Sequence, residues 1–441
     1  MTYLNEMKNK HITVLGLGVT GLGIVRFLLS QGLTPNVVDS RQSPPGCDWL
    51  QQHAPNLTTQ FGNLATAQLE SADMIIISPG LSLTLPAVAQ AMQAGVEVIG
   101  DIELFARLTD KPVVAVTGSN GKSTVVTLAY EVLKTAGYKV GLGGNIGTAA
   151  LDLLADDFDV YVLELSSFQL DTMQSLKPVS ATVLNVSEDH LDRYPSYQAY
   201  IDSKQTIYAN AALAIVNKTD PATYTQTMPQ LSFGLENADY CLMTYQGDSY
   251  FSYQGKALLP VSSLAVVGRH NQLNALAVMA LLSPFDISAS QFAQAFSQFT
   301  GLAHRCQFVA EQAGVKYFND SKATNVGATI AAIESLADQA KQLVVIAGGD
   351  AKGADLDSLK PYLQQQVKAL ICFGKDAKAL VALTDKGHLT ENMQQAVMLA
   401  KQLATAGDIV LLAPACASID MYNNYMQRGD HFSQCVLAEA V

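Results

Sequence analysis

The sequence predicts an α/β fold made of three domains. The length of 441 residues corresponds to about three domains of ~150 residues each. A short apolar strand that runs into a glycine-rich turn occurs three times, at Leu15, Val116 and Ile346, without a fixed period. Each such turn marks an edge of a sheet that can face a ligand. We expect domains over residues 1–100, 101–302 and 303–441.

The composition indicates a globular protein and disfavours several kinds of partner. Only 15% of the residues are charged, and the net charge is −12, from 27 basic and 39 acidic residues. Because the basic residues form no run, nucleic acid is not an expected partner. The N-terminus has no apolar signal core, and no apolar run approaches the ~18 residues of a membrane span. The six cysteines form no CxxC pair, so we expect reduced thiols in a cytoplasmic protein.

The strongest local pattern is a strand, a glycine loop and a helix in direct succession. Val113–Val116 is a β-branched apolar run, Thr117–Gly121 holds two glycines, and Lys122, Ser123 and Thr124 open a segment with helical apolar spacing. The motif G-x-x-G-K-S-T is shorter than the full phosphate-loop pattern. Backbone N–H groups and the lysine can bind phosphates, and a hydroxyl can ligate Mg²⁺. The alternative is an ordinary turn with a surface lysine.

The first domain carries a dinucleotide-binding fingerprint. The strand His11–Leu15 runs into the motif GLGVTG, Gly16–Gly21, and a helix follows. Asp39 ends the next strand, 23 residues after Gly16, where an acid can bind a ribose. The alternative is a glycine turn that only packs a helix on a sheet.

Two further segments of the central domain place acids near strand ends. Glu164 lies within the apolar run Val160–Leu165, where a carboxylate is costly unless it is paired or bound to a metal. It could hold Mg²⁺ or pair with a structural cation. His190 lies in the acidic segment Ser187–Asp192, which follows another strand. It could be a metal ligand or a histidine of a polar loop, and both readings stay open.

Several polar residues have both a structural and a functional interpretation. Asn271 and Asn274 share one helix face and suit adenine or amide recognition, but Asn271 can also cap the helix. The segment Tyr317–Asn325 can meet a nucleotide and an anion, or cap the next helix. Asn145 is favoured as the cap of a glycine turn, and Lys204 as a solvated lysine of a helix.

Eight segments, spread over nearly the whole chain, resemble the Mur ligases, ATP-dependent enzymes that build the peptide stem of peptidoglycan. The segments are GSNGKST (Gly118–Thr124), GGNIG (Gly143–Gly147), LELSSFQL (Leu163–Leu170), NVSEDHLDRY (Asn185–Tyr194), GRHNQLNA (Gly268–Ala275), GLAHR (Gly301–Arg305), NDSKATN (Asn319–Asn325) and PACASID (Pro414–Asp420). LELSSFQL, together with DIELF (Asp101–Phe105) and ISPG (Ile77–Gly80), resembles the branch of the family that adds D-glutamate.

The resemblance implies an N-terminal Rossmann-like domain, a central P-loop-type mononucleotide-binding ATPase domain and a C-terminal Rossmann-like domain. It implies an amide ligase that adds D-glutamate to UDP-N-acetylmuramoyl-L-alanine through an acyl phosphate, with ATP and two Mg²⁺ ions. The fingerprint of the first domain would then bind the UDP-sugar, and no NAD is expected. A monomer is expected.

The resemblance also implies roles for individual residues. ATP would contact Gly118, Ser119, Asn120, Gly121, Lys122, Ser123, Thr124, Asn271, Asn274, Arg305 and Asp320. Mg²⁺ would be held by Ser123, Glu164, His190 and a carbamylated Lys204. The UDP-sugar would contact Val19, Thr20, Asp39, Ser40, Arg41, Ser78 and Asn145. D-glutamate would contact Lys322, Thr324, Lys352, Ser418 and Tyr425. Lys122, His190 and Lys204 would carry the catalysis. Tyr425 stands where a phenylalanine is expected.

Three alternative functions remain at this stage. The first is another Mur or folylpolyglutamate-type ligase, against which the GLGVTG unit before the ATPase domain argues. The second is an NAD-dependent oxidoreductase fused to an ATPase. The third is a nucleotide switch without catalysis.

Overall fold

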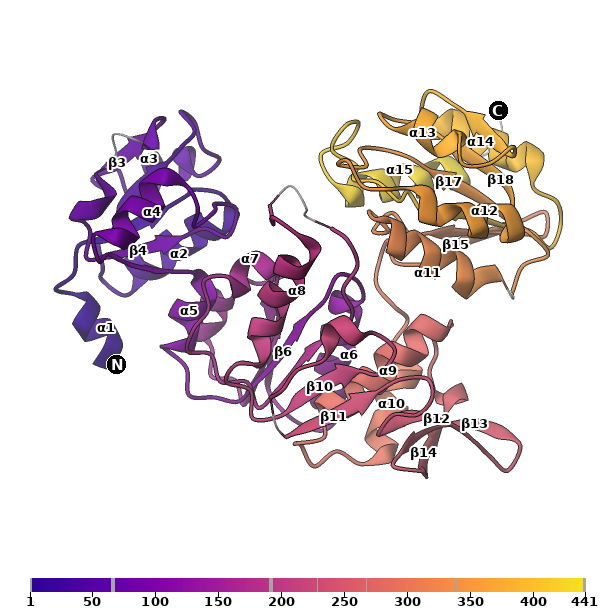
Figure 1. Cartoon of the computed structure of the whole chain (residues 1–441), viewed down its shortest axis with the longest axis horizontal. Helices are drawn as coiled ribbons and strands as arrows, with labels where there is room; N and C mark the ends of the chain where they lie inside the picture. Colours follow the sequence, from indigo (N-terminus) through magenta and orange to yellow (C-terminus); the bar gives the residue numbers. More distant parts are fainter. Residues whose placement is uncertain are drawn as a thin grey trace. The chain divides into compact units, whose positions relative to one another are not determined.

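The computed structural model describes residues 2–64, 68–189, 193–227, 229–266, 268–337 and 339–438. These residues contain three separate β-sheets with helices beside each (Figure 1). One sheet lies within each of the predicted ranges 1–100, 101–302 and 303–441. The α/β fold class with three domains is thus confirmed, while the boundaries stay predictions. By contacts, the described chain forms two compact units, one with the first two sheets and one with the third.

The first sheet has five parallel strands in the order β3-β2-β1-β4-β5. The strands β1 and β4 are buried along their whole length, which fits their mainly apolar sequences ITVL and MIII, with Thr13 as the one polar residue. The chain leaves β1 between two neighbouring strands, so the turn that follows opens at the ligand-facing edge. The elements are α1 (Thr2–Met7), β1 (Ile12–Leu15), α2 (Val19–Ser30), β2 (Asn36–Asp39), α3 (Cys47–His53), β3 (Thr59–Phe61), η2 (Leu69–Ser71), β4 (Met74–Ile77), α4 (Pro86–Gln93) and β5 (Glu97–Ile99).

The second sheet has nine strands in the order β14-β13-β12-β11-β10-β9-β6-β8-β7, and β13 runs opposite to the other eight. The strand β6 lies between β9 and β8, so the loop after it opens between two parallel neighbours and not at an edge strand. The elements are α5 (Asp101–Ala106), β6 (Val113–Thr117), α6 (Lys122–Thr135), β7 (Val140–Gly144), η3 (Ala150–Ala155), β8 (Val160–Glu164), α7 (Ser167–Leu170), β9 (Ser180–Val183), α8 (Tyr197–Gln205), η4 (Thr206–Tyr208), β10 (Ala214–Asn217), η5 (Pro221–Thr223), β11 (Gln230–Phe233), β12 (Tyr240–Tyr245), β13 (Asp248–Tyr253), β14 (Lys256–Pro260), η6 (Val261–Ser263), α9 (Arg269–Leu281) and α10 (Ala289–Gln298).

The third sheet has the order β15-β16-β20-β17-β18-β19, and all pairs except β15 with β16 are parallel. Because β16, β20 and β17 are neighbours, the loops after them share one edge of the sheet. The elements are β15 (Gln307–Gln312), β16 (Val315–Asn319), α11 (Val326–Ala337), β17 (Leu343–Ala347), η7 (Asp357–Leu359), α12 (Lys360–Gln366), β18 (Val367–Cys372), α13 (Ala377–Val381), β19 (Gly387–Leu389), α14 (Met393–Leu403), β20 (Ile409–Leu412) and α15 (Tyr425–Leu437).

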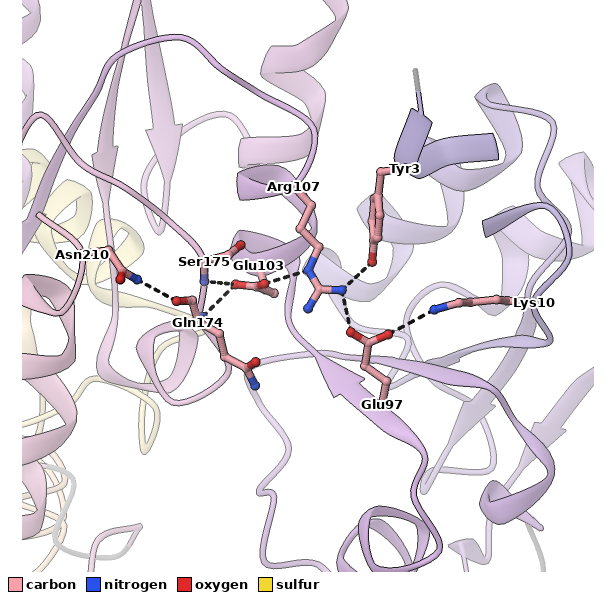
Figure 2. A network of polar contacts seen from close by, with 8 residues as sticks. All are labelled: Tyr3, Lys10, Glu97, Glu103, Arg107, Gln174, Ser175 and Asn210. Atoms are coloured by element: carbon pink, nitrogen blue, oxygen red, sulfur yellow. Dashed lines mark hydrogen bonds and ion pairs between the residues drawn. The ribbon is translucent and has the colours of Figure 1, made fainter. Parts of the chain in front are cut away.

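A polar network centred on Arg107 connects the first two sheets (Figure 2). Arg107 Nη1 donates to Glu97 Oε1 of β5 and to the Tyr3 hydroxyl of α1, both at 2.6 Å. Its Nε donates to Glu103 Oε1 of α5 at 2.7 Å. The fully buried Glu103 also accepts the backbone N–H groups of Gln174 and the next residue, at 2.7 and 2.8 Å. One guanidinium therefore ties α1, β5 and α5 to the segment after α7.

The cysteines and the helix lengths bear on two further expectations. All six cysteines are free thiols, as predicted. Within the described ranges, none of the helices combines the length and the apolar character that crossing a bilayer requires.

Candidate active site

The loop between β6 and α6 has the conformation that its glycines allow. Gly118 and Gly121 have left-handed backbone with φ of 150° and 83°, which residues with a Cβ disfavour. A Cβ at Gly118 would lie 3.1 Å from the Cβ of Leu184. The helix α6 begins at Lys122, directly after the loop, so the positive end of its dipole lies at the loop. The predicted strand, loop and helix are confirmed, and together they suit an anion.

Two lysine ammonium groups converge on this loop. Lys122 Nζ donates to the carbonyl oxygens of Gly118 and Ser119, at 2.7 and 3.0 Å. Lys204 Nζ, from α8, donates to the same Gly118 oxygen at 3.0 Å and lies 4.6 Å from the centroid of the Tyr200 ring. Lys204 is only 2% exposed. The interpretation of Lys204 as a solvated lysine is therefore wrong, because α8 turns this side chain toward the loop.

Asn185 holds the loop from the end of the neighbouring strand β9. Its Oδ1 accepts the N–H of Asn120 at 2.8 Å, and its Nδ2 donates to the Asn120 carbonyl oxygen at 3.1 Å. Its own carbonyl oxygen accepts the N–H of Ser119 at 2.9 Å. In the sequence, Asn185 stands out only as part of the motif NVSEDHLDRY. Its position near the end of a predicted strand was the one available signal.

Glu164 lies beside the loop, because β8 pairs with β6 and brings Val116 opposite Glu164. The carboxylate is 3% exposed. Its Oε1 accepts a hydrogen bond from Asn145 Nδ2 at 2.8 Å, and its carbonyl oxygen accepts the Asn145 N–H at the same distance. Asn145 thus binds the strand end, and its interpretation as a turn cap is wrong.

The residues next to the loop fit a divalent cation. Glu164 Oε2 is buried and has no hydrogen-bond partner among the described residues, which leaves a carboxylate oxygen for a cation. Ser123, in the first turn of α6, is also buried. No group of three or more His, Cys, Asp or Glu side chains gathers in the described part of the chain. Mg²⁺ commonly takes phosphate, hydroxyl and water oxygens beside one or two carboxylates, and the Ser123 hydroxyl suits such a ligand set. His190 lies outside the described residues.

The fingerprint of the first domain uses its acid internally. Asp39 is 1% exposed and accepts the N–H of Leu17 at 2.6 Å, the N–H of Arg41 at 2.8 Å, and Arg41 Nε and Nη2 at 2.9 and 2.7 Å. Burial alone would raise the pKa of Asp39, but the hydrogen bonds from Arg41 and Leu17 outweigh it and lower the pKa. Both oxygens are therefore occupied, whereas half of the Arg41 side chain is exposed. This edge offers a cation to a ligand more readily than a carboxylate.

Apart from Asn145, which lies beside Glu164 in the second sheet, the other UDP-sugar candidates lie around the same turn. Gly21 must lack a side chain, because a Cβ there would overlap the carbonyl oxygen of Gly16. Ser78 is buried after β4, and a Cβ at Gly16 would lie 2.9 Å from the Cβ of Ser78. At the start of α2, Val19 is 90% exposed and Thr20 is half-buried, while Ser40 is exposed after β2. The fold therefore brings these residues to one turn.

In the third sheet, the loops after β16, β17 and β20 are joined to one another. The Ala415 N–H donates to the Ala323 carbonyl oxygen, and the Gly348 N–H to that of Pro414, both at 2.9 Å. Asp350 and Ala417 form an antiparallel bridge. The D-glutamate candidates on these loops therefore lie at one edge of one sheet. They are Lys322, Thr324, Lys352 and Ser418.

Tyr425 begins α15 and contacts the first of these loops. Lys322 Nζ lies 4.2 Å from the centroid of the Tyr425 ring, which is a cation–π contact. The Ser321 hydroxyl donates to the Tyr425 carbonyl oxygen at 2.8 Å. Lys352 is exposed and has left-handed backbone, with φ of 53°, and its N–H binds Asp350 Oδ1. This backbone is strained for a lysine, which is typical of functional positions.

The remaining ATP candidates form two pairs. Asp320 follows β16, and burial raises the pKa of its carboxyl to about 7, against the opposing effect of the Arg305 guanidinium. Asn274 Nδ2 donates to Asn271 Oδ1 at 3.5 Å on α9, so these two side chains share a helix face as predicted.

Comparisons with known proteins agree along the chain. The model of the Mur ligase MurD-like N-terminal domain matches residues 10–100, the Mur ligase middle domain matches 116–282, and the Mur ligase glutamate ligase domain matches 304–416. A protein of Pseudoalteromonas translucida, named UDP-N-acetylmuramoylalanine–D-glutamate ligase, is 74% identical over the full length of both chains. The chain belongs to the Mur ligase family. A relative of the same name from Shewanella oneidensis is 47% identical, over 97% of this Mur ligase and 98% of its own chain.

Solved structures support the fold of this Mur ligase. MurF of Acinetobacter baumannii superposes with a TM-score of 0.64 at 14% identity, over 98% of both chains. MurF of Thermotoga maritima, solved with ADP, gives 0.63 at 17% identity, over 98% of this chain and 96% of its own. Folylpolyglutamate synthase of Mycobacterium tuberculosis, solved with ADP and AMPPCP, gives a TM-score of 0.58 at 14% identity. The superposition covers 75% of this chain and 94% of the synthase chain. At these identities the likeness concerns the fold alone.

Proposed function

We propose that this Mur ligase joins D-glutamate to UDP-N-acetylmuramoyl-L-alanine, with ATP converted to ADP and phosphate. The observation that carries the proposal is the 74% identity, over the whole chain, to a relative with that name. Further relatives from Haemophilus, Shewanella and Pasteurella, at 45–47% identity, have the same name. The product is UDP-N-acetylmuramoyl-L-alanyl-D-glutamate, a precursor of peptidoglycan. This agreement favours the D-glutamate branch over the folylpolyglutamate-type and oxidoreductase alternatives.

The first step makes the substrate carboxylate reactive. A carboxylate is a poor electrophile, so an oxygen of the L-alanine carboxylate attacks the γ-phosphorus of ATP. The bond to the β-phosphate oxygen breaks, which gives an acyl phosphate and ADP. The position of the Lys122 ammonium on the loop supports this step, because it can offset the charge on the phosphoryl group during transfer. ATP would contact the loop through Gly118, Ser119, Asn120, Gly121, Lys122, Ser123 and Thr124.

The second step forms the amide bond. The amine of D-glutamate attacks the carbonyl carbon of the acyl phosphate, and a tetrahedral intermediate forms. The intermediate expels phosphate, and the nitrogen loses a proton to leave a neutral amide. The lysines of the third domain support this step, since two ammonium groups suit a substrate with two carboxylates. D-glutamate would contact Lys322, Thr324, Lys352, Ser418 and Tyr425.

The first domain would hold the UDP-sugar. Arg41 supports this assignment, because its side chain is half exposed and its guanidinium is suited to a diphosphate, while Asp39 fixes its orientation. Asp39 would therefore act through Arg41 and the Leu17 N–H. The other contacts would be Val19, Thr20, Ser40, Ser78 and Asn145.

The cofactor and the remaining nucleotide contacts extend the same proposal. Mg²⁺, when bound, would neutralise phosphate charge, with Ser123, Glu164, His190 and a carbamylated Lys204 as proposed ligands. A second ion is part of the proposal. The adenine side and the phosphates would further contact Asn271, Asn274, Arg305 and Asp320. The domain boundaries at residues 100 and 302, a cytoplasmic location and a monomeric state also stay predictions.

The test is phosphate release from ATP by the purified protein. We expect release only when UDP-N-acetylmuramoyl-L-alanine and D-glutamate are both present, and none when L-glutamate replaces D-glutamate. Mass spectrometry of the product should show one added glutamyl residue. ATP consumption at one rate with and without the two substrates would contradict the proposal.

A further inference from the structure

A buried arginine lies behind the loops of the third sheet. Arg428, on α15, is 1% exposed and is among the largest fully buried side chains. Its Nε donates to the Ser321 hydroxyl at 3.0 Å and its Nη2 to the Ser321 carbonyl oxygen at 2.8 Å. Its Nη1 donates to the carbonyl oxygens of Cys416 and Gly348, at 3.1 and 3.3 Å. One planar guanidinium therefore joins three separate segments.

The three segments are the loops that carry the proposed D-glutamate contacts. Ser321 directly precedes Lys322, and Cys416 lies two residues before Ser418. Gly348 begins the loop that leads to Lys352. The fourth segment that it fixes is its own helix, which begins at Tyr425.

We propose that Arg428 is a positioning residue for D-glutamate, because its guanidinium sets the spacing of the three loops and adds positive charge behind them. This inference rests on the proposed function, since it concerns the same amino-acid pocket. Arg428 would act without touching the substrate, through the loops that it joins.

The charge of Arg428 is not neutralised by an ion pair within the described residues. Its four hydrogen bonds go to three carbonyl oxygens and one hydroxyl. Burial lowers its pKa to about 10, which still leaves the side chain charged at neutral pH. Asp420 and Tyr422 act on it only from a distance, and burial raises the pKa of the Cys416 thiol to about 12, so that thiol is neutral. A cation kept at this depth favours an anion at the loop surface.

The packing around the guanidinium leaves little freedom. Gly349 has left-handed backbone with φ of 127°, and a Cβ there would lie 3.2 Å from Arg428 Nη1 and would overlap the Ala417 carbonyl oxygen. Gly429 likewise has no room for a side chain, because a Cβ would overlap the ring of His304. A lysine at position 428 could keep the positive charge but not the several N–H donors of a planar guanidinium. A methionine could keep much of the side-chain volume but has neither the charge nor the donors.

The experiment compares Arg428→Lys and Arg428→Met with the wild type in the full phosphate-release assay. We expect the KM for D-glutamate to rise about tenfold or more in both variants, since small displacements of binding groups have effects of this size. The KM for UDP-N-acetylmuramoyl-L-alanine should stay within about twofold of wild type, because its proposed contacts lie outside the third domain. Arg428→Lys should retain more activity than Arg428→Met if charge contributes.

Two further variants separate positioning from loss of folding. Ser321→Ala removes the hydroxyl that Arg428 Nε contacts but leaves the arginine in place, and should raise the KM for D-glutamate in the same direction. Arg107→Lys is the matched control, because Arg107 is also a hydrogen-bonded arginine but joins α1, β5 and α5. It should lower the melting temperature and leave the KM for D-glutamate unchanged.

The outcomes decide separately on the inference and on the proposed function. A wild-type enzyme that does not use D-glutamate would overturn the proposed function, and the inference with it. A wild-type enzyme that uses D-glutamate, with unchanged KM in all three variants, would overturn only the inference. If both Arg428 variants fail to fold, Ser321→Ala decides: an unchanged KM there overturns the inference, and a raised one supports it.

Discussion

Lys204 Nζ donates a hydrogen bond to the carbonyl oxygen of Gly118 at 3.0 Å, so a buried helix lysine contacts the first glycine of the phosphate loop. An ammonium in this position would repel a divalent cation next to Glu164. A carbamate on the same nitrogen would instead be an anion and could ligate the cation. A carbamate on Lys204 Nζ would therefore lie at the phosphate loop, where the proposed Mg²⁺ site is.

The carbamylation of Lys204 predicts a dependence of activity on dissolved carbon dioxide. Wild-type enzyme depleted of bicarbonate should lose activity and recover it when bicarbonate is added back, as measured by phosphate release. Lys204→Met should be inactive in both conditions, because it cannot form the carbamate. A depleted wild-type enzyme that keeps full activity would contradict carbamylation.

Lys122→Ala should reduce turnover by at least about 100-fold, because the ammonium that offsets transferring charge is lost. The measurement is the rate of phosphate release at saturating substrates. Lys134→Ala is the control, since Lys134 lies in the last turn of the same helix α6 and should leave the rate unchanged. Similar rates in the two variants would remove Lys122 from the proposed chemistry.

Tyr425→Phe should bind D-glutamate about as well as wild type, whereas Tyr425→Ala should raise the KM roughly tenfold. The contact with Lys322 Nζ is made by the face of the ring, 4.2 Å away, and a cation–π contact of this kind contributes about 1 kcal/mol or more. Phenylalanine keeps that face and loses only the hydroxyl. If both variants lose affinity equally, the hydroxyl is the important group and the ring contact is incidental.

The sequence allowed prediction of the features that depend on neighbouring residues. The strand, glycine loop and helix around Lys122 follow from local periodicity and from glycines that need left-handed backbone. Hydrogen-bond partners that are far apart in the sequence could not be predicted in this way. Asn185 reaches Asn120 from 65 residues away, and Arg428 reaches Ser321 from 107 residues away. Such pairs depend on strand order, which periodicity does not determine.

Asp39 shows what the spacing of a motif does not reveal about its acid. Its position after Gly16 matched a ribose-binding acid, and the spacing does bring it to the turn. The sequence could not show that both of its oxygens accept hydrogen bonds from Arg41 and Leu17. The nearby arginine, two residues along, was the available signal.

Glu103→Gln should destabilise the protein by about 2–4 kcal/mol, because it leaves Arg107 without its buried carboxylate partner. Burial acts to raise the pKa of Glu103, but the N–H groups of Ser175 and Gln174 and the Arg107 guanidinium lower it overall. The carboxylate therefore stabilises the folded state above the pKa of the unfolded chain, and this contribution is lost as pH falls through the folded pKa. Thermal unfolding should show a smaller loss of stability in acid for Glu103→Gln than for wild type. Equal acid sensitivity would contradict the assignment.

Asp320 predicts the opposite dependence on pH. Burial raises the pKa of its carboxyl to about 7 in the folded protein, whereas the unfolded chain releases this proton near pH 4. Between these values the folded state holds a proton that the unfolded state has lost, so stability falls as pH rises from about 4 to 7. Asp320→Asn is neutral at every pH and should remove this slope. The melting temperature of wild type should therefore drop more between pH 5 and pH 7.5 than that of Asp320→Asn, and parallel curves would show that Asp320 ionises normally in the folded protein.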